Sequence, residues 1–417
     1  MIKKSIALLF FTCSVATLVF GQSSVNYNKG GINTVTTAVP FLLITPDSRG
    51  GALGDCGVAS SADANSMHWN PAKYVFADRD FGLSMSYTPW LRQLVPDISL
   101  SYLAGYKKLG KFAAVAGSLR YFTLGSIQFT DNSGNNIGTY KPSETALDGS
   151  YSQKLGKSFS MGIAMRYIYS NLTNSIPLPN GTVTHAGTSF AVDIAMYYKS
   201  KKFKMQDKKA EATGGLNISN IGTKISYTDG ATEQSKDFIP IQMRLGGGLK
   251  IHLDDYNTIT FLTDFTKLLV PTPPIYAINP ATGLKIPDGN GGYIIAAGQD
   301  PYRPVPAGII GSFSDAPGGA KEELKEINIG TGMEYWYDNL LAFRMGYFHE
   351  DKTKGNRQYL TFGLGIKYSV FGIDLSYLVP ITQRNPLQNT LRFSLSFDFA
   401  AAKKGDTSSD TKAPTGN

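Results

Sequence analysis

Residues 159–169 read FSMGIAMRYIY, and the alternation in this stretch decides the fold. Every second residue, beginning with the first, is Phe, Met, Ile or Tyr, and the residues between them include Ser, Gly, Ala and Arg166. A period of two places these two sets on opposite faces of a β-strand. Residues 391–399, LRFSLSFDF, show the same pattern. One face of such strands suits lipid and the other suits a polar interior.

This alternation recurs in fourteen segments of roughly ten residues between residues 81 and 399. An even number of strands is typical of bacterial single-chain barrels. The sequence therefore predicts an all-β fold, a transmembrane β-barrel of about 14 antiparallel strands. The predicted strands are 81–88, 97–107, 111–124, 144–154, 159–171, 187–199, 211–222, 238–253, 258–270, 326–337, 340–350, 358–369, 371–379 and 390–399.

The connections between these segments alternate between short and long. Residues 155–158 and 254–257 are short connections, whereas 125–143 and 271–325 are long ones. Outer-membrane barrels have short periplasmic turns and longer outer loops. The pattern predicts an outer-membrane location with both termini in the periplasm. A soluble β-sandwich or propeller can share this composition but has little reason to alternate its connections.

Residues 1–21 have the features of a secretory signal peptide, with Lys3 and Lys4 before the apolar run 6–20. The mature chain then begins at Gln22 and keeps one cysteine, Cys56, so no disulfide within it is possible. Beyond the signal no run of about 18 apolar residues occurs, which argues against a helical membrane protein. We divide the rest into an N-terminal arm and plug (22–80), the barrel (81–399) and a disordered polar tail (400–417).

The formal net charge of +8 bears on the partners of an exported chain. Such a chain rarely meets nucleic acid, so anionic lipid head groups of the outer membrane or acidic partners are the expected counterparts. Part of the charge lies in residues 199–209, KSKKFKMQDKK. We interpret this cluster as a solvated turn, with a binding site as the alternative.

Residues 47–72 precede the barrel, do not alternate and are rich in Gly and Ala. A segment this polar and Gly-rich cannot form a core alone, so we expect a compact plug with short helical turns inside the barrel. Arg49 or Asp55 would pair with charges on the lumen face, and Trp69 would pack against the inner wall. The predicted plug residues are Arg49, Asp55, Asp63, Trp69, Asn70 and Pro71.

No group of residues with the pattern of a metal or catalytic site is evident in the sequence. The four histidines are scattered over the predicted plug, loops and strands, so we expect no metal site, no cofactor and no enzymatic activity. The predicted lumen face carries charges of both signs. They suit either a network that anchors the plug or a path for a solute.

The predicted plug carries a family resemblance. Residues 49–55, RGGALGD, are followed by 66–72, SMHWNPA, and the pattern continues into 89–91, PWL. In this order the chain resembles the PorV family of the type IX secretion system of Bacteroidetes, a distant relative of FadL-like transporters. The resemblance implies a FadL-like barrel that binds the C-terminal signal domain of exported cargo. Such a protein carries cargo from the translocon barrel to the sortase attachment complex on the surface.

The alternative function is that of a FadL-like outer-membrane channel for hydrophobic small molecules. Such a channel needs an apolar pocket in the lumen and a lateral opening in the wall. Charged positions on the predicted lumen face argue against a wide apolar lumen, whereas a pocket near the outer rim remains compatible with the pattern.

The connection 271–325 is far longer than a barrel needs. Loops longer than about 15 residues are usually functional or disordered. This one interleaves prolines with aliphatic and aromatic residues, which suits protein contacts. We expect it to contact the translocon or cargo, with sealing of its own barrel as the alternative. The predicted anchors are Tyr302, Ile309, Ile310 and Phe313.

The sequence predicts a heat-modifiable protein. A closed barrel satisfies its backbone hydrogen bonds internally, so it resists unfolding by detergent until it is boiled. We expect unboiled and boiled samples to migrate differently on a denaturing gel, with a circular dichroism spectrum dominated by β-structure. A mainly helical spectrum would contradict the fold.

Overall fold

The computed structural model describes residues 31–91, 95, 97–130, 133–172, 183–381, 387–388 and 390–399. The predicted signal peptide (1–21), the first part of the predicted arm (22–30) and the predicted tail (400–417) lie outside the described residues. Within the described ranges, no helix combines the length and the apolar character needed to cross a membrane.

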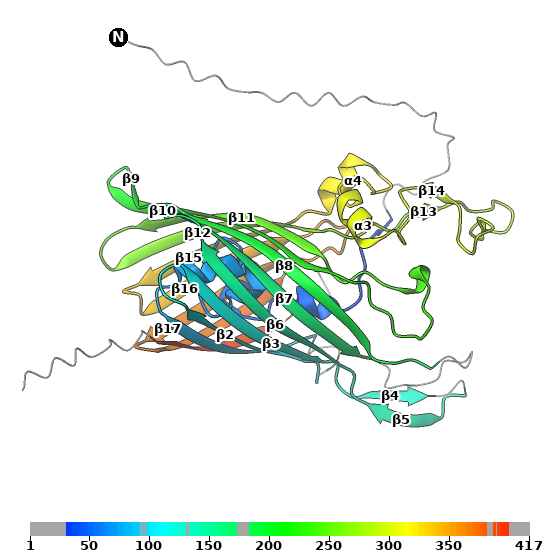
Figure 1. Ribbon diagram of the computed structural model, residues 1–417, viewed down its shortest axis with the longest axis horizontal. Helices are drawn as coiled ribbons and strands as arrows, with labels where there is room; N and C mark the ends of the chain where they lie inside the picture. The colour runs from blue at the N-terminus through cyan, green and yellow to red at the C-terminus, as the bar shows by residue number, and fades with distance from the viewer. Residues whose placement is uncertain are drawn as a thin grey trace, which may run out of the picture. The chain divides into compact units, whose positions relative to one another are not determined.

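Fourteen antiparallel strands form a closed barrel (Figure 1). It closes where β1 (Phe81–Pro89) pairs with β19 (Leu391–Phe399), with Phe81 opposite Phe399. All fourteen predicted segments are strands of this barrel, which confirms the predicted fold class. The remaining strands are β2 (Ser99–Lys108), β3 (Ala113–Thr123), β6 (Ser143–Lys154), β7 (Phe159–Asn171), β8 (Gly187–Lys199), β10 (Lys208–Gly222), β11 (Gln242–His252), β12 (Asn257–Leu268), β15 (Asn328–Tyr337), β16 (Leu341–His349), β17 (Gln358–Tyr368) and β18 (Phe371–Pro380).

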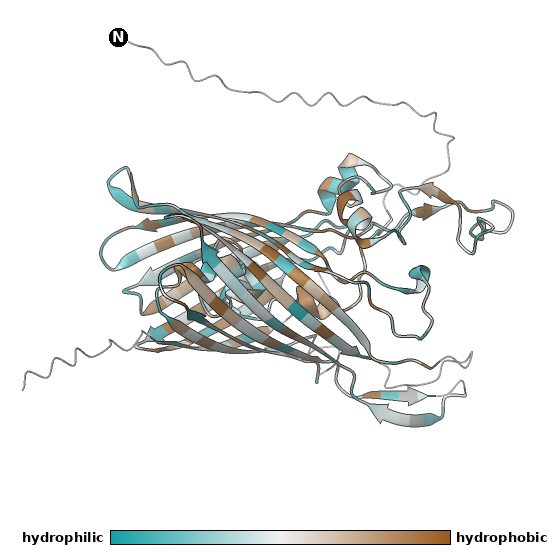
Figure 2. Ribbon diagram, viewed as in Figure 1, coloured by the Kyte–Doolittle hydropathy of each residue, from teal (hydrophilic) through white to brown (hydrophobic). Residues whose placement is uncertain are grey.

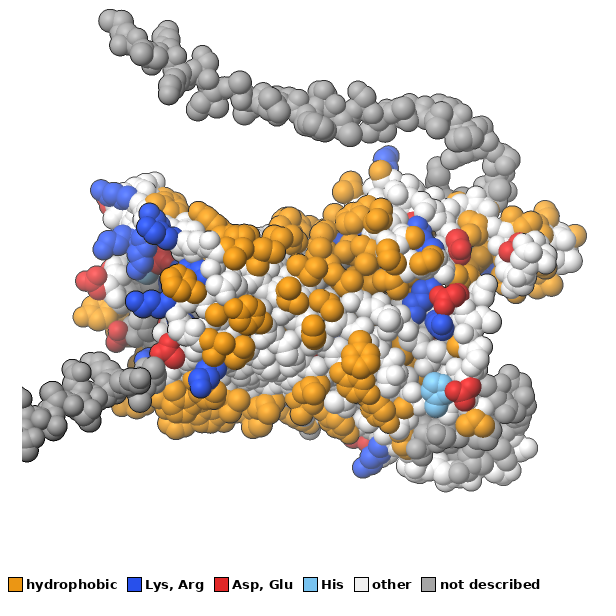
Figure 3. Space-filling view, viewed as in Figure 1, with side chains coloured by type: hydrophobic (Ala, Val, Ile, Leu, Met, Phe, Trp, Pro, Cys, Tyr) orange, Lys and Arg blue, Asp and Glu red, His pale blue; other side chains and the backbone are white. Residues whose placement is uncertain are grey.

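Apolar and polar residues alternate along the strands, as the colours in Figure 2 show, and exposed residues alternate with buried ones along β7. On β7, Met165 is 69% exposed while its neighbour Arg166 is buried. Apolar side chains cover much of the barrel's outer surface in Figure 3. Exposed apolar surface on this scale is characteristic of a wall that faces lipid.

The two ends of the barrel differ in their connections. At the short-turn end, where β1 begins and β19 ends, neighbouring strands are joined by tight turns such as 155–158 and 253–256. At the long-connection end, the connections are longer and contain structure of their own. These additional elements are β4 (Ile127–Thr130), β5 (Asn136–Tyr140), η3 (Glu233–Ser235), β13 (Ile275–Tyr276), β14 (Ile295–Ala297), α3 (Val305–Gly311) and α4 (Ala320–Lys325).

Two details differ from the sequence prediction. The predicted strand 238–253 begins only at Gln242, because the apolar residues before it pack into the lumen instead of joining the ladder. The lysine-rich connection 199–209 is not a plain turn, since β9 (Phe203–Met205) pairs with the start of β10 and prolongs the hairpin.

Residues 38–77, hereafter the inner segment, lie within the barrel (Figure 1). The Ser48 amide donates to Ser394 Oγ on β19 (2.9 Å), and Asn70 Nδ2 donates to the Met196 carbonyl on β8 (2.9 Å). These two strands are six places apart around the barrel, on nearly opposite sides. The segment contains the short helical turns η1 (Pro40–Leu43), α1 (Ser48–Gly51), α2 (Ser66–Trp69) and η2 (Pro71–Phe76).

The chain enters the barrel at the long-connection end. The Asn33 amide donates to the Thr353 carbonyl, and its side chain donates to Glu322 in α4. The chain leaves at the short-turn end, where the Asp80 amide donates to the Phe399 carbonyl. The sequence predicts that residues 22–46 form a periplasmic arm leading to the plug. Over its described part the arm lies at the opposite end, because its side chains bind to the long connections.

Glycines on the inner wall allow the inner segment to approach the strands. A Cβ at Gly346 would lie 2.1 Å from the Gly54 amide nitrogen, and one at Gly332 would lie 2.5 Å from the Leu53 carbonyl oxygen. Gly54 itself has a φ of +69°, a left-handed conformation that favours glycine. Backbone therefore packs directly on backbone along β15 and β16.

Substitution of Gly346 by Ala should loosen this contact. The new methyl group collides with a backbone atom, which has no rotamer to move aside, so we expect a loss of about 1–3 kcal/mol in the free energy of unfolding. Gly149→Ala is the matched control, because a Cβ there meets nothing within 4 Å. Guanidinium unfolding in detergent measures both variants; equal midpoints would show that the segment does not press on the wall.

Candidate functional site

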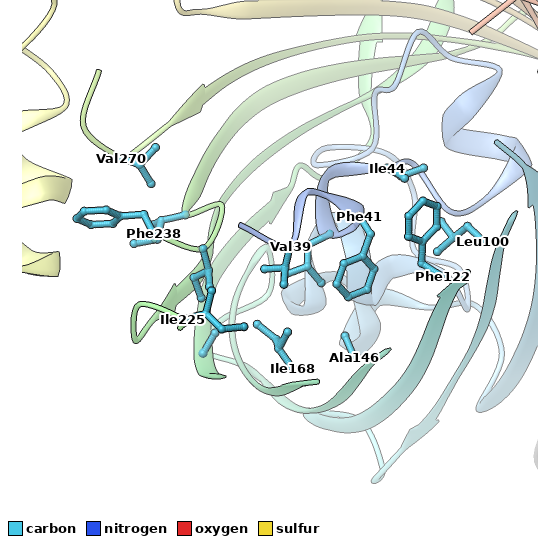
Figure 4. Packing of buried hydrophobic residues seen from close by; sticks show 14 of the residues in the cluster. Val39, Phe41, Ile44, Leu100, Phe122, Ala146, Ile168, Ile225, Phe238 and Val270 are labelled. Carbon is cyan, nitrogen blue, oxygen red and sulfur yellow. The ribbon is translucent and has the colours of Figure 1, made fainter. Parts of the chain in front are cut away.

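Apolar residues of the inner segment fill the lumen near the long-connection end. Val39, Phe41 and Leu42 are at most 3% exposed and pack into a cluster with barrel residues (Figure 4). The Phe41 ring stacks on Phe122 with centroids 6.2 Å apart. Val39 has a φ of +46°, which is costly for a β-branched residue, so tertiary packing must hold it there. We call this cluster the apolar chamber.

Arg49 joins the inner segment to the wall through charge. Its Nε and Nη2 donate to the two carboxylate oxygens of Glu334, both at 2.9 Å. Arg344 Nε donates to the same carboxylate at 2.8 Å, and Arg49 Nη1 reaches Asp63 at 2.8 Å. Glu334 is buried and accepts hydrogen bonds from both guanidinium groups, so the segment and the strands share one network.

Trp69 is buried at the centre of the inner segment. Its Nε1 donates to Asp47 Oδ1 at 2.7 Å, and the other oxygen of Asp47 accepts from the Gly50 amide. The ring packs so closely on Gly50 and Gly57 that a Cβ on either would lie within 2.2 Å of it. Arg244 lies over the ring at 4.8 Å. Burial, and then the charge of Asp63, raises the pKa of Asp47 to about 6.

His68 lies between two guanidinium groups of the wall. Its Nδ1 is 2.9 Å from Arg120 Nη2, and its Nε2 is 3.4 Å from Arg244 Nη2. Burial and the charges of these arginines hold the pKa of His68 well below its usual value. The imidazole is therefore neutral and accepts a hydrogen bond at Nδ1 from Arg120.

Asn70 and Pro71 form the junction between α2 and η2. Asn70 Oδ1 accepts from the Ala72 amide and so caps η2, in which Pro71 is the first residue. Asn70 Nδ2 donates to the Val58 carbonyl as well as to Met196. One residue thus ends a helix through its backbone amide, which donates to the Ser66 carbonyl, and through its side chain it begins the next helix and binds the wall.

Asp55 faces a cavity of about 250 Å³ between the inner segment and the long connections. Its Oδ2 accepts from the Tyr359 hydroxyl at 2.5 Å, and its Oδ1 lies 4.0 Å from Arg392. Arg244, Arg357 and other charged residues also line this cavity. Val35, Leu43, Leu268 and Phe348 line it as well, so the cavity has both charged and apolar walls.

Helix α4 is fixed to the rim by a cluster of buried ion pairs. Lys267 on β12 binds Glu323 at 3.0 Å and also Glu326. Lys354, in the connection after β16, binds Glu322 at 2.6 Å and Glu326 at 2.9 Å. These contacts tie α4 to strand β12 and to the connection after β16.

The predicted partner anchors lie on or near α3 and have different environments. Ile310 is 76% exposed, Phe313 52% and Tyr302 40%. Ile309 instead packs against the apolar chamber. Its place as an exposed anchor is therefore not supported, because one face of α3 is used to cover the barrel while the other remains open.

Sequence reasoning did not single out three residues that organise the inner segment. Asp47 binds Trp69, Lys73 donates to the Gly57 carbonyl at 2.8 Å, and Asp264 accepts from the Gly57 and Val58 amides. The sequence carries no periodic signal for such contacts, because the partners are far apart along the chain.

Within the described residues, no group of three or more His, Cys, Asp or Glu side chains is arranged to hold a metal ion. Cys56 is buried among small residues, and burial raises the pKa of its thiol well above the ordinary value. The side chains described above pack in the lumen, form ion pairs or are exposed on α3.

Comparison with solved structures found barrels of low sequence identity. A mutant of the monoaromatic hydrocarbon channel TodX is 12% identical, with 85% of this chain and 99% of that chain covered and a TM-score of 0.48. The Ralstonia pickettii toluene transporter TbuX is 11% identical (85% and 98% covered, TM-score 0.43), and a Pseudomonas aeruginosa FadL homologue is 13% identical (88% and 99%, TM-score 0.40). A search of curated proteins found no match.

The fold and the site define a class: an outer-membrane β-barrel whose lumen holds its own N-terminal segment. A family model described as "Type IX secretion system protein PorV" matches residues 27–275, more than half of the chain. The chain belongs to the PorV family, and it is an outer-membrane component of the type IX secretion system.

Replacement of Trp69 by Ala should destabilise the inner segment. Removal of a fully buried ring leaves a cavity and takes the hydrogen-bond donor from Asp47 Oδ1, so we expect a cost of about 3–5 kcal/mol in the free energy of unfolding. Trp69→Phe keeps most of the packing and should cost less. Labelling of Cys56 by a bulky maleimide gives a second measurement, since only the Ala variant should expose the thiol in the folded barrel. An unchanged midpoint and slow labelling would contradict the packing role.

Proposed function

We propose that this protein binds the C-terminal signal domain of exported cargo and carries it from the translocon barrel to the sortase attachment complex at the surface. Membership of the PorV family supports a role in type IX secretion. The observation that carries the finer proposal is the pair of exposed apolar side chains Ile310, on the open face of α3, and Phe313, two residues after the end of α3. Exposed apolar side chains of this kind suit a protein contact.

The orientation and the division of the chain are part of the proposal. We place the long connections outside the cell and the short-turn end in the periplasm, with a signal peptide (1–21), an arm and plug (22–80), the barrel (81–399) and a polar tail (400–417). The charge pairs of Arg49 and the burial of Trp69 support a structural plug. In this orientation the inner segment enters from the outer side and stays under α4.

The alternative, a FadL-like channel for hydrophobic small molecules, is less well supported. The part of the lumen best suited to an apolar ligand is the chamber already filled by Val39, Phe41 and Leu42. Pairing within the barrel wall has one register shift, a bulge between Ile218 and Ile221 on β10, and is otherwise continuous over the described strands. An uptake assay with a labelled aromatic hydrocarbon would reveal such a channel.

Substitution of the exposed face of α3 tests the cargo role. In Ile310→Asp/Phe313→Asp, two exposed side chains become charged without disturbing the core, so the barrel should assemble normally. We expect cargo secretion to fall at least tenfold and co-purification with the translocon to be lost, because burial of an unpaired carboxylate opposes the contact. The amount of heat-modifiable barrel in outer membranes checks assembly.

Ile127→Asp/Val183→Asp provides the matched control. These apolar residues are 39% and 53% exposed in other long connections. The control should secrete cargo normally. Normal secretion by the α3 variant would refute the proposed contact, whereas hydrocarbon uptake by the unmodified protein would favour the channel.

A further inference from the structure

The turns at the short-turn end carry an uneven charge. Three of them, which join β2 to β3, β6 to β7 and β8 to β10, hold eleven lysines and two carboxylates, Asp207 and Glu211, when the adjoining ends of these strands are included. We call these lysines the basic rim. They are Lys107, Lys108, Lys111, Lys154, Lys157, Lys199, Lys201, Lys202, Lys204, Lys208 and Lys209.

The basic rim is continuous around part of the barrel. Strands β2, β3, β6, β7, β8 and β10 are consecutive neighbours in the sheet, so their turns lie next to one another. In Figure 3 Lys and Arg side chains gather at the barrel end where Figure 1 places β9. Elsewhere on this end the charge is mainly negative, with Asp254, Asp255 and Asp338 in the remaining turns. The excess of lysine is thus a local feature of one arc.

Several of these lysines are bound within the chain: Lys108 Nζ donates to the Ala77 carbonyl at 2.9 Å, Lys208 Nζ donates to the Leu253 carbonyl at 2.6 Å, and the Lys154 ammonium lies 4.4 Å from the centroid of the Phe76 ring.

Other lysines of the basic rim lie near carboxylates. The carboxylate of Glu211 lies 3.4 Å from Lys199 Nζ and 3.7 Å from Lys202 Nζ. The carboxylate of Asp207 lies 3.8 Å from Lys204 Nζ. These are the carboxylates that the three turns supply. Lysines held this close repel one another unless a partner provides negative charge.

Exposed apolar side chains lie beside the lysines. Phe112 is 63% exposed, Leu155 60%, Leu109 51% and Phe203 42%, and each adjoins a lysine in the sequence or is one residue removed from it. A lysine next to Phe or Leu is suited to the part of a lipid bilayer where the head groups meet the acyl chains. There the ammonium group meets phosphate while the apolar side chain enters the hydrocarbon.

We propose that the basic rim binds the head groups of anionic phospholipids in the leaflet that faces the periplasm. Charge complementarity selects the phosphate, and the interleaved Leu and Phe residues extend the lipid-facing wall into the head-group region. An acidic protein would match the charge but would not account for these apolar side chains at the edge of the wall. Only the choice of leaflet rests on the orientation proposed above; the binding chemistry does not.

Lipid retention by the purified full-length barrel tests this proposal. The protein in detergent is mixed with equal amounts of phosphatidylglycerol and phosphatidylcholine, and bound lipid is counted by native mass spectrometry. We expect phosphatidylglycerol to be preferred by about tenfold, with the preference falling as salt screens the contact. Equal retention of the two lipids would overturn the proposal.

Two charge-matched variants locate the site. Lys201→Gln/Lys204→Gln/Lys208→Gln/Lys209→Gln removes four exposed lysines of the basic rim, and Lys285→Gln/Lys321→Gln/Lys325→Gln/Lys352→Gln removes four at the other end. The rim variant should lose most of the preference and the other variant should keep it. Replacement of the same rim lysines by Arg should restore binding. Equal loss in both Gln variants would show a nonspecific charge effect and refute the site. Cargo secretion is not measured here, so failure would leave the proposed function untouched.

Discussion

Closure of the sheet between β1 and β19 is the constraint on which the rest of the structure depends. A wall surrounded by hydrocarbon must satisfy each backbone donor and acceptor internally, and a sheet does so only when it has no free edge. The pairing of Phe81 with Phe399 completes this ring. Closure then separates lipid from lumen, so that alternate residues of each strand face different solvents. The apolar outer face and the charged inner face both follow from this one geometric fact.

The lumen created by closure is filled in two different ways. Near the long-connection end, Val39 and Phe41 pack with apolar wall residues, and burial of apolar area stabilises the contact. Deeper in the barrel the same segment meets charges, and Arg49 shares the Glu334 carboxylate with Arg344. Glycines such as Gly346 leave room for backbone contact. The inner segment is therefore held by shape, by apolar burial and by ion pairs, each against a different arc of the wall.

Residues of the long connections pack against the end of the barrel, and they also expose apolar side chains. Ion pairs of Lys267 and Lys354 fix α4 over the mouth of the barrel, and Ile309 turns one face of α3 toward the apolar chamber. Ile310 and Phe313 remain on the outer face. A rigid base with an exposed apolar face is well suited to a protein contact, because little entropy is lost when the partner binds. One face of this element thus covers the barrel, and the opposite face leaves apolar side chains exposed for the contact proposed above.

The sequence by itself determined the class of fold, the position of all fourteen barrel strands and the small-residue segment that enters the lumen. These features depend on local periodicity and composition, which a chain displays without reference to distant residues. Only the tertiary structure decided the direction in which the segment enters, the hydrogen bond of Trp69 to Asp47, the placement of His68 between two arginines and the inward turn of Ile309. Each of these depends on which distant strands meet across the lumen. Nothing in the spacing of residues 22–46 shows that Asn33 binds the connection after β16, because that contact joins parts of the chain more than 300 residues apart.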